Sequence, residues 1–209
     1  MLSISLVCIV RNADGRLRKL IENHKDVVSE VIVVDQYSTD GTYEEALELA
    51  DFVVQRRHKG TADPDRNYAF SLASKDYVLY LDDDECFTDE AKVLLPSIVE
   101  TNADAFWFKR DNYVDGVDIR EITGEDPQCR LFKRGAVKFP SRIHKYPEPA
   151  MDIRVFHLDC AIRHDRGFDQ MVKANRSREV IADKDEKKLQ DDFINKVTDY
   201  LTNGLRPSR

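Results

Sequence analysis

The residues of clearest chemical meaning in this sequence are four consecutive carboxylates, Asp82 to Glu85, which directly follow the apolar stretch YVLYL. Like charges this close raise one another's pKa unless cations lie among them. Such a cluster fits three roles: a solvated turn, a nucleophilic aspartate, or a set of oxygen ligands for Mg²⁺ or Mn²⁺ with open positions for phosphate oxygens. The rest of the sequence has to decide among them.

Other polar residues favour a metal ion with a nucleotide on it. Arg66, near the start of a predicted helix, offers a guanidinium beside helix-end amides to a diphosphate, and Asp35, at a strand end, offers an acceptor to a base or ribose. Taken singly, a surface salt bridge explains Arg66 and a turn cap explains Asp35 equally well. Since neither GxxxxGK[ST] nor GxGxxG occurs, the carboxylates would have to bind the phosphates through a metal.

The elements that position these residues alternate along the first half of the chain. Apolar runs at 4–10, 30–35, 51–57 and 76–82 predict strands, and the intervening segments carry helical spacing, with Asp63 or Asp65 near the start of the third helix. This order predicts an α/β fold with a mostly parallel sheet and helices on both faces. Ligands of such sheets bind beyond the carboxyl ends of the strands, where Arg11-Asn12, Asp35 and the carboxylates all fall.

The second half has a different pattern. Residues 88–100 read as a helix with Thr88 as N-cap, 103–110 as a strand, 111–118 as a hairpin, and 129–140 as two short strands around Gly135. After an extended segment at 152–166, a charged helical arm begins at Phe168. Its stripe of Leu189, Phe193, Val197 and Leu201 is expected to pack on the core, with a dimer or membrane contact as the second interpretation.

Composition sets the outer limits. The chain has 209 residues, of which 34% are charged and 42% hydrophobic, as expected for a globular protein. Its net charge of −7 argues against broad affinity for nucleic acid. The four cysteines are widely spaced, which favours reduced thiols in a cytoplasmic protein, and the apolar start reads as a strand instead of a signal peptide. The terminal NGLRPSR resembles a linker, so we expect a module of a longer protein.

Four segments resemble the family 2 glycosyltransferases in order and spacing: SLVCIVRNADGRLRKLIENH, EVIVVDQYSTDGT, DRNYAFSLASKDYVLYLDDDE and CRLFKRGAVKFPSRIHK. The likeness covers residues 3 to 165 and is greatest to the short bacterial branch typified by lipopolysaccharide-core glucosyltransferases. It implies a GT-A fold, with a nucleotide-binding half at 1–101, a mixed acceptor-binding half at 102–167, and the helical arm at 168–209. It also implies inverting transfer of a sugar from a nucleotide-sugar, UDP-hexose being favoured, with Mn²⁺ or Mg²⁺ on the diphosphate.

The resemblance also assigns roles to residues. Asp82 matches the first acid of the family's DxD motif, toward the ribose, and Asp84 matches the second, toward the metal. His164, in AIRHDRGF, resembles a histidine that completes the metal site, with His144 and His157 as rivals. The full set implied for the nucleotide is Val10, Arg11, Asn12, Asp35, Asp63, Arg66, Asp82 and Asp83.

Inversion needs a general base beside the acceptor hydroxyl. Asp126, in TGEDPQC, is predicted for this role because family members often place the base in an ED segment, and Glu125 and Asp111 are competitors. The sequence departs from the family in two ways: Lys145 stands where a glutamate is expected, and Asp83 fills the DxD motif, which leaves open which two carboxylates meet the cation.

The partners are the least determined part. A glycan, a lipid-linked sugar or a protein are all open as acceptors, and a basic stretch is expected to face an anionic acceptor, the cytoplasmic membrane face or simply solvent. That stretch comprises Lys133, Arg134, Lys138, Arg142 and Lys145. Two other classes stay open: a metal-dependent nucleotidyltransferase or nuclease, and a non-catalytic nucleotide-sugar-binding module. The nucleophilic aspartate is the weakest interpretation, since the haloacid-dehalogenase phosphatases carry their motif after the first strand and here it follows the fourth.

Overall fold

The computed structural model describes residues 3–13, 15–140, 147–149, 152–178 and 184–203. The chain divides into two compact units, Met1–Lys109 with Pro127–Ile162 and Arg110–Asp126 with Arg163–Arg209, which we call the first and second unit. Two long strands, β6 (Ala105–Val114) and β11 (Val155–Arg166), begin in the first unit and end in the second. The predicted division at residues 101 and 167 stays a prediction.

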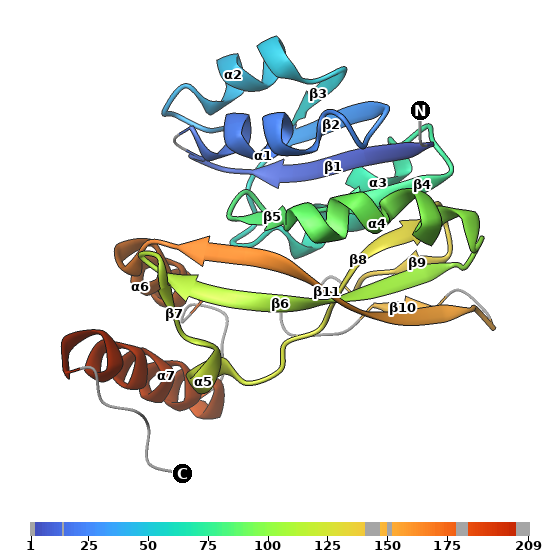
Figure 1. Cartoon of the computed structure of the whole chain (residues 1–209). Coiled ribbons are helices and arrows are strands. Elements are labelled where there is room, and N and C mark those ends of the chain that lie inside the picture. The colour runs from blue at the N-terminus through green and yellow to red at the C-terminus, as the bar shows by residue number, and fades with distance from the viewer. Residues whose placement is uncertain (1–2, 14, 141–146, 150–151, 179–183, 204–209) are drawn as a thin grey trace. The chain divides into compact units, whose positions relative to one another are not determined.

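The first unit contains the alternating elements expected from the sequence (Figure 1). Its helices are α1 (Arg16–His24), α2 (Thr42–Leu49), α3 (Arg66–Ser71) and α4 (Asp89–Glu100), with a 3-10 turn η1 (Asp63–Asp65) before α3. Its strands, besides the first parts of β6 and β11, are β1 (Ile4–Val10), β2 (Glu30–Asp35), β3 (Phe52–Gln55), β4 (Tyr77–Tyr80), β5 (Glu85–Phe87), β8 (Gln128–Lys133), β9 (Val137–Lys138) and β10 (Glu148–Pro149).

The main sheet has the strand order β3-β2-β1-β4-β8-β6-β11-β5 within the described residues. The pairs β1·β2, β1·β4 and β2·β3 are parallel, which confirms the expectation for the first four strands. From β4 onward the pairs β4·β8 and β6·β8 are antiparallel. The sheet is therefore mixed, and its parallel half carries the predicted nucleotide-binding residues.

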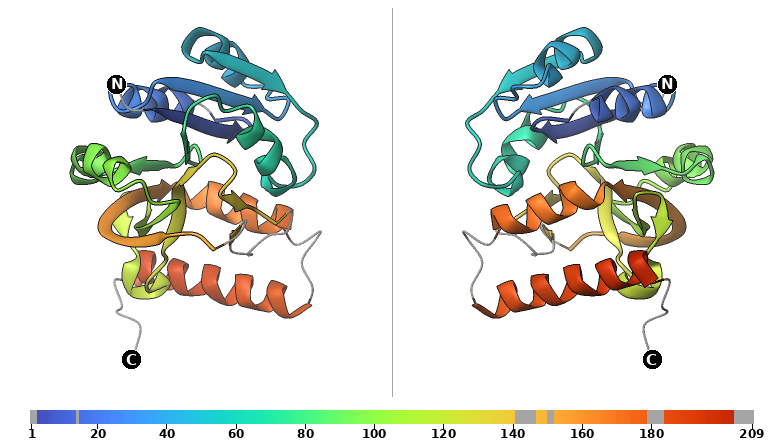
Figure 2. Two further views of the ribbon diagram at one scale, coloured as in Figure 1. Left: turned by 90° about the vertical axis from the view of Figure 1, so that its right-hand side faces the viewer. Right: turned by 90° about the vertical axis from the view of Figure 1, so that its left-hand side faces the viewer.

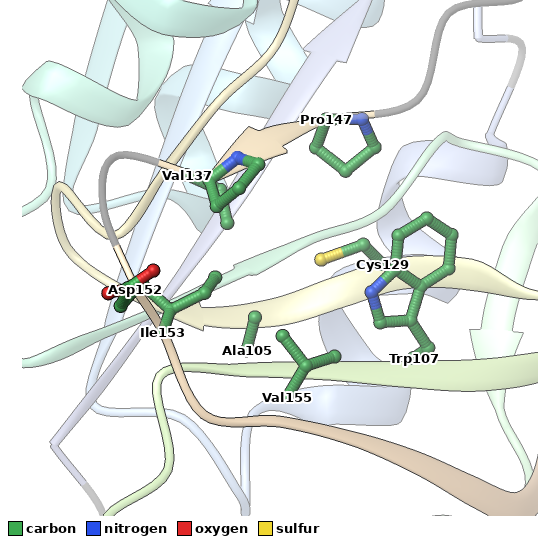
Figure 3. Close-up of a pocket in the computed structure, with 9 residues that line it drawn as sticks. Ala105, Trp107, Cys129, Val137, Pro147, Asp152, Ile153 and Val155 are labelled. Atoms are coloured by element: carbon green, nitrogen blue, oxygen red, sulfur yellow. The ribbon is translucent and has the colours of Figure 1, made fainter.

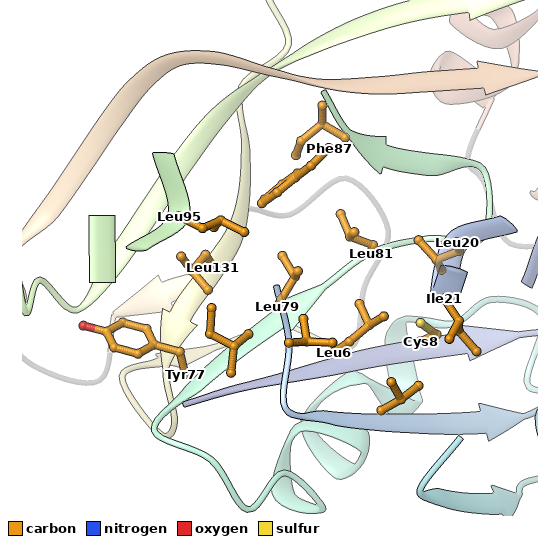
Figure 4. Close-up of a cluster of buried hydrophobic side chains, with 14 of the residues drawn as sticks. Leu6, Cys8, Leu20, Ile21, Tyr77, Leu79, Leu81, Phe87, Leu95 and Leu131 are labelled. Carbon is orange, nitrogen blue, oxygen red and sulfur yellow. The ribbon is translucent and has the colours of Figure 1, made fainter. Parts of the chain in front are cut away.

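Both faces of the parallel half are covered. Alternate residues of β1 point to opposite sides: Leu6 and Cys8 pack with residues of α1 and α4, whereas Val7 and Ile9 pack with Ala69 and Phe70 of α3. Figure 2 shows α1 and α4 on one side of these strands and α3 on the other. The first of these clusters, drawn in Figure 4, joins the helices to the strands whose ends form the candidate site.

The second unit is smaller and mainly helical. It contains β7 (Val117–Asp118), α5 (Arg120–Thr123), α6 (Phe168–Arg178) and α7 (Lys184–Asn203), with the last parts of β6 and β11. The predicted hairpin forms between β6 and β7. Phe193, Val197 and Leu201 pack with Val114, as the apolar stripe predicted, while the side chain of Leu189 lies outside the described residues. No described helix is long and apolar enough to cross a membrane.

Two local features qualify the predictions. Thr88 caps α4 as expected, since the Ala91 N–H donates to its Oγ1 at 3.3 Å. Strand β5, which the sequence did not predict, begins at Glu85, the last of the four carboxylates. Its three residues are too few to give a pattern, and the backbone N–H of Thr88, just after β5, donates to Ala161 of β11, a neighbour far away in the chain.

Candidate functional site

The carboxyl ends of β1 and β2 lie side by side, and their following loops are joined by hydrogen bonds. Val10, buried, pairs with Asp35 in the parallel register. Two residues further on, the Asn12 N–H donates to Ser38 Oγ at 2.9 Å, and the Thr39 N–H donates to Asn12 Oδ1 at 2.8 Å. The predicted nucleotide-binding residues Val10, Asn12 and Asp35 are thus brought together at one edge of the sheet.

Asp35 is fully buried at this edge. Its carboxylate accepts hydrogen bonds from Gln55 Nε2 at 2.9 Å and from the Ser38 N–H at 3.2 Å. A buried carboxylate with such donors is held in one orientation. Asp35 therefore fixes the loop after β2, whatever it contributes to a ligand.

The four carboxylates after β4 form a tight turn, which we call the acidic turn (Asp82–Glu85). The Glu85 N–H donates to the Asp82 carbonyl at 3.0 Å, and the Asp82 N–H donates back to Glu85 Oε2 at 3.2 Å. Asp83 and Asp84 occupy the two central positions. The turn is closed at both ends, so the two central carboxylates are presented by a fixed backbone.

Two arginines supply the positive charge that the acidic turn requires. Arg130 of β8, with 4% of its side chain exposed, donates to both carboxylate oxygens of Glu85 at 2.8 Å and to Asp82 Oδ2 at 3.1 Å. Burial lowers the pKa of Arg130, but the charges of Glu85 and Asp82 outweigh burial and raise it. The sequence analysis did not identify this residue, which comes from a distant strand.

Arg16, at the start of α1, donates to Asp83 Oδ2 at 2.7 Å. Burial, and next the charge of Asp84, nevertheless raise the pKa of Asp83 to about 6 against the opposing effect of Arg16. Repulsion from Asp84 and Asp82 therefore still disfavours the ionised form of Asp83, although Arg16 lies beside it. Such a place attracts a further cation.

Arg66, predicted to face the phosphates, connects to the acidic turn through Tyr80. Its Nε donates to the Tyr80 hydroxyl at 3.2 Å, and that hydroxyl donates to Asp82 Oδ1 at 2.8 Å. Its Nη1 lies 2.9 Å from Asp63 Oδ1, so the predicted Asp63 pairs with Arg66. Burial lowers the pKa of Arg66, but Tyr80, Asp82 and Asp63 outweigh burial, so the pKa is raised.

A buried histidine, His24 of α1, contacts strand β5, which begins at the last residue of the acidic turn. His24 Nε2 accepts the N–H of Phe87 in β5 at 3.1 Å, and its Nδ1 lies 2.7 Å from the Leu20 carbonyl, to which it donates. Burial lowers the pKa of His24 to about 4. The neutral ring therefore ties α1 to the strand that begins at Glu85.

In the second unit, Asp126 and His164 share one amide. Asn112, which is buried, donates through Nδ2 to Asp126 Oδ2 at 3.2 Å, and its Oδ1 lies 2.7 Å from His164 Nδ1. Since that oxygen can only accept, His164 donates from Nδ1 and keeps its lone pair on Nε2 in the neutral ring. Arg110 Nη2 pairs with Asp126 Oδ2 at 2.6 Å. Neither Asn112 nor Arg110 was predicted from the sequence.

The competing predictions occupy other surroundings. Asp111 pairs with Arg120 at 3.3 Å, and Glu125 is exposed. His157 stacks on Trp107, with 5.7 Å between the ring centroids. Three other residues named from the sequence lie outside the described residues: Arg142, His144 and Lys145.

Trp107 also lines a pocket of about 390 Å³ in the first unit (Figure 3). Most of its walls are apolar, and Asp152 is its one carboxylate among the described residues. All its lining residues fall in the segment predicted to be acceptor-binding. Apolar walls with a single polar group are common in ligand pockets.

The carboxylates of the acidic turn suit a hard cation by their chemistry, since Mg²⁺ and Mn²⁺ prefer oxygen ligands. In the described part of the chain, no group of three or more His, Cys, Asp or Glu side chains is arranged to hold a metal ion. Mg²⁺ is usually bound by one or two carboxylates together with substrate phosphates instead of by a complete protein cage. The donor set therefore fits a metal that arrives with a phosphate ligand.

Residues 5–161 match the family model described as glycosyl transferase family 2. The SPbeta prophage-derived glycosyltransferase SunS of Bacillus subtilis is 28% identical over 152 residues, which are 69% of this chain and 35% of SunS. An uncharacterized glycosyltransferase of Rickettsia felis is 36% identical over 90 residues, 43% of this chain and 31% of that protein. The chain spans about a third of the length of these curated relatives.

Solved structures of S. aureus TarS 1-349 have the same fold. The complex with UDP has a TM-score of 0.58 at 19% identity, and the match covers 97% of this chain and 74% of TarS 1-349. The complex with UDP-GlcNAc has a TM-score of 0.58 at 18% identity, with 97% and 75% covered. The predicted GT-A fold is confirmed by this likeness and by the mixed sheet.

Proposed function

The chain belongs to glycosyl transferase family 2, and we propose that it moves a sugar, with inversion, from a nucleoside diphosphate sugar to an acceptor hydroxyl. The observation that carries this proposal is the acidic turn. It is a hydrogen-bonded turn of four carboxylates at the carboxyl end of a parallel strand, where nucleotides bind in such sheets. TarS, which shares the fold, was solved with UDP and with UDP-GlcNAc, which supports a uridine nucleotide as donor.

Mn²⁺ or Mg²⁺ is the proposed cofactor. Bound to the donor diphosphate, the ion would neutralise phosphate charge as a Lewis acid. Asp84, at the centre of the acidic turn, is the proposed ligand, because it matches the second acid of the family's DxD motif. That His164 also coordinates the ion stays a prediction, and the lone pair on its Nε2 suits that role.

Two side chains of the first unit are proposed to act on the nucleotide. Arg66 would stabilise negative charge on the departing nucleoside diphosphate, and this stabilisation grows toward the transition state. Its links to Tyr80 and Asp63 hold the guanidinium in place before the donor arrives. Asp82, whose orientation Arg130 and Tyr80 fix, is the proposed partner of the ribose hydroxyls.

Asp126 is the proposed general base. It would accept the proton of the acceptor hydroxyl as that oxygen attacks the anomeric carbon. Its carboxylate accepts hydrogen bonds from Arg110 and Asn112, which hold it in one orientation. The identity of the sugar, the narrower likeness to lipopolysaccharide-core enzymes, and a lipid-linked acceptor at the cytoplasmic membrane face remain predictions.

Product analysis tests the proposal against its two rivals. The protein is incubated with labelled nucleotide-sugars, Mn²⁺ and a panel of glycan and lipid-linked acceptors. A transferase forms nucleoside diphosphate and a new glycoside, whose anomeric configuration NMR reads as inverted. Cleavage within the nucleotide regardless of the sugar would instead indicate a nucleotidyltransferase or nuclease, and donor that binds without turnover would indicate a binding module. Glu48→Gln, a change at an exposed carboxylate paired with Arg18, serves as the control.

A further inference from the structure

Tyr37 lies at the strand ends where the nucleoside is proposed to bind. Val10 and Asp35 pair in the register of β1 and β2, and the Gln36 N–H donates to the Val10 carbonyl at 2.8 Å. Tyr37 lies two residues after Asp35 at the end of β2, just as Asn12 lies two residues after Val10 at the end of β1. The next residue, Ser38, accepts the hydrogen bond of the Asn12 N–H. Tyr37 is therefore a chain neighbour of residues that are predicted to bind the nucleotide.

The backbone of Tyr37 is in an unfavourable conformation. Its φ is 55°, in the left-handed region that non-glycine residues with bulky side chains rarely adopt. The other non-glycine residues with positive φ among the described residues are Asn12, Asn102 and Asp115, whose short polar side chains tolerate this region. Tyrosine gains no such help, so this position costs free energy in the folded chain.

Little packing of the Tyr37 side chain offsets the free-energy cost of its backbone conformation. Tyr37 is 58% exposed, whereas Asp35 is fully buried and Gln36 is 3% exposed. The loop is thus fixed by the two buried residues before Tyr37, and the tyrosine ring faces solvent. A strained backbone that holds an exposed aromatic ring beside a ligand site indicates a role in binding.

We propose that the ring of Tyr37 stacks on the nucleobase of the donor. Every nucleobase has a flat π-face, and an aromatic side chain fixed in advance stacks on it without losing further freedom. This assignment rests on the proposed function, since it takes the ligand to be a nucleoside diphosphate. It adds an aromatic contact to a site in which Asp35 is predicted to meet the base or ribose.

Two variants separate the ring from the strain. Tyr37→Asn removes the ring and substitutes a residue that tolerates φ of 55°, and Tyr37→Phe keeps both ring and strain. We expect the asparagine variant to melt about 2–4 °C above wild type yet to bind the nucleoside diphosphate about 5- to 150-fold more weakly. The phenylalanine variant should bind as wild type does. Asn102→Gly, at φ of 52° after α4, is the control and should leave binding unchanged.

Calorimetry with UDP and with inorganic pyrophosphate, both in Mn²⁺, reads the outcome. Weaker binding of UDP with unchanged binding of pyrophosphate in Tyr37→Asn supports stacking on the base. Unchanged binding of UDP in that variant, or equal loss in Tyr37→Phe, would overturn it. A lower melting temperature of Tyr37→Asn would overturn the argument from strain. If wild type binds neither UDP nor any other nucleoside diphosphate, the proposed function itself fails, which is a distinguishable result.

Discussion

Carboxylates pair with an arginine both in the acidic turn of the first unit and at Asp126 of the second unit, but the two pairs differ in how deeply they are buried. In the acidic turn, the side chain of Arg130 is 4% exposed, and its guanidinium pairs with both Asp82 and Glu85. At Asp126, the arginine and the carboxylate keep 20% and 27% of their side chains exposed, and one carboxylate oxygen takes the contacts from Arg110 and Asn112.

The difference fits two kinds of chemistry. A buried ion pair that closes a turn fixes the backbone and contributes mainly to geometry, because neither partner can leave without stranding a charge. A partly exposed pair is weaker, and its carboxylate can exchange the arginine for an acceptor hydroxyl. We infer that the first region binds and orients the donor while the second carries out proton transfer.

Removing the proposed base should have the largest effect on the reaction. Asp126→Asn keeps the size of the side chain and can still contact Arg110, but it cannot take a proton. We expect kcat to fall about 10²- to 10⁴-fold, while calorimetry finds the donor affinity unchanged. Asp111→Asn is the matched variant and should retain most activity. Full activity of Asp126→Asn would remove Asp126 from the mechanism and with it the contrast between the regions.

The two arginines should differ in their effect on the free energy of unfolding. Arg130→Met leaves the buried Glu85 carboxylate without compensation, and we expect a loss of about 3–5 kcal/mol. Arg110→Met removes a partly exposed pair and should cost about 1 kcal/mol or less. Urea denaturation measures both. Combining Arg130→Met with Glu85→Met should recover part of the loss, and equal costs for the two single variants would refute the distinction.

A smaller effect on the free energy of unfolding is expected from His24, which contacts β5 next to the acidic turn. Because burial lowers the pKa of His24 to about 4 from 6.5, the unfolded chain takes up its proton first as the pH falls. The contribution is complete above pH 6.5 and is lost toward pH 4. Between pH 7 and 5 we expect a loss of about 2 kcal/mol in wild type. His24→Gln should lack this part of the pH dependence in urea titrations, and an unchanged slope would rule His24 out.

The parallel half of the fold could be predicted because its signals are local. Each of the strands β1, β2 and β4 is a continuous apolar run that ends in polar residues, and parallel strands bring such ends to one edge. The positions of Asn12, Asp35 and the acidic turn follow from that rule alone. Their shared edge is confirmed in part by the β1·β2 and β1·β4 registers.

The cations that balance the acidic turn could not be found in this way. Arg130 lies 45 residues from Glu85 in the chain, and its contact depends on the antiparallel placement of β8 beside β4. The one available signal was a charged residue within the otherwise apolar stretch CRLF, which a buried strand tolerates only with a partner. Asn112 gave no signal, since an amide in a strand has many ordinary roles.

The central claim is that the acidic turn binds the donor diphosphate through a divalent cation. Calorimetry of a nucleotide-sugar panel, with Mn²⁺ and after chelation, on wild type, Asp84→Asn and the exposed control Asp89→Asn tests it most directly. We predict that one nucleoside diphosphate sugar binds wild type and Asp89→Asn only with metal, and that Asp84→Asn loses this binding. Binding that ignores both the metal and Asp84 would contradict the claim and make the acidic turn a structural element alone.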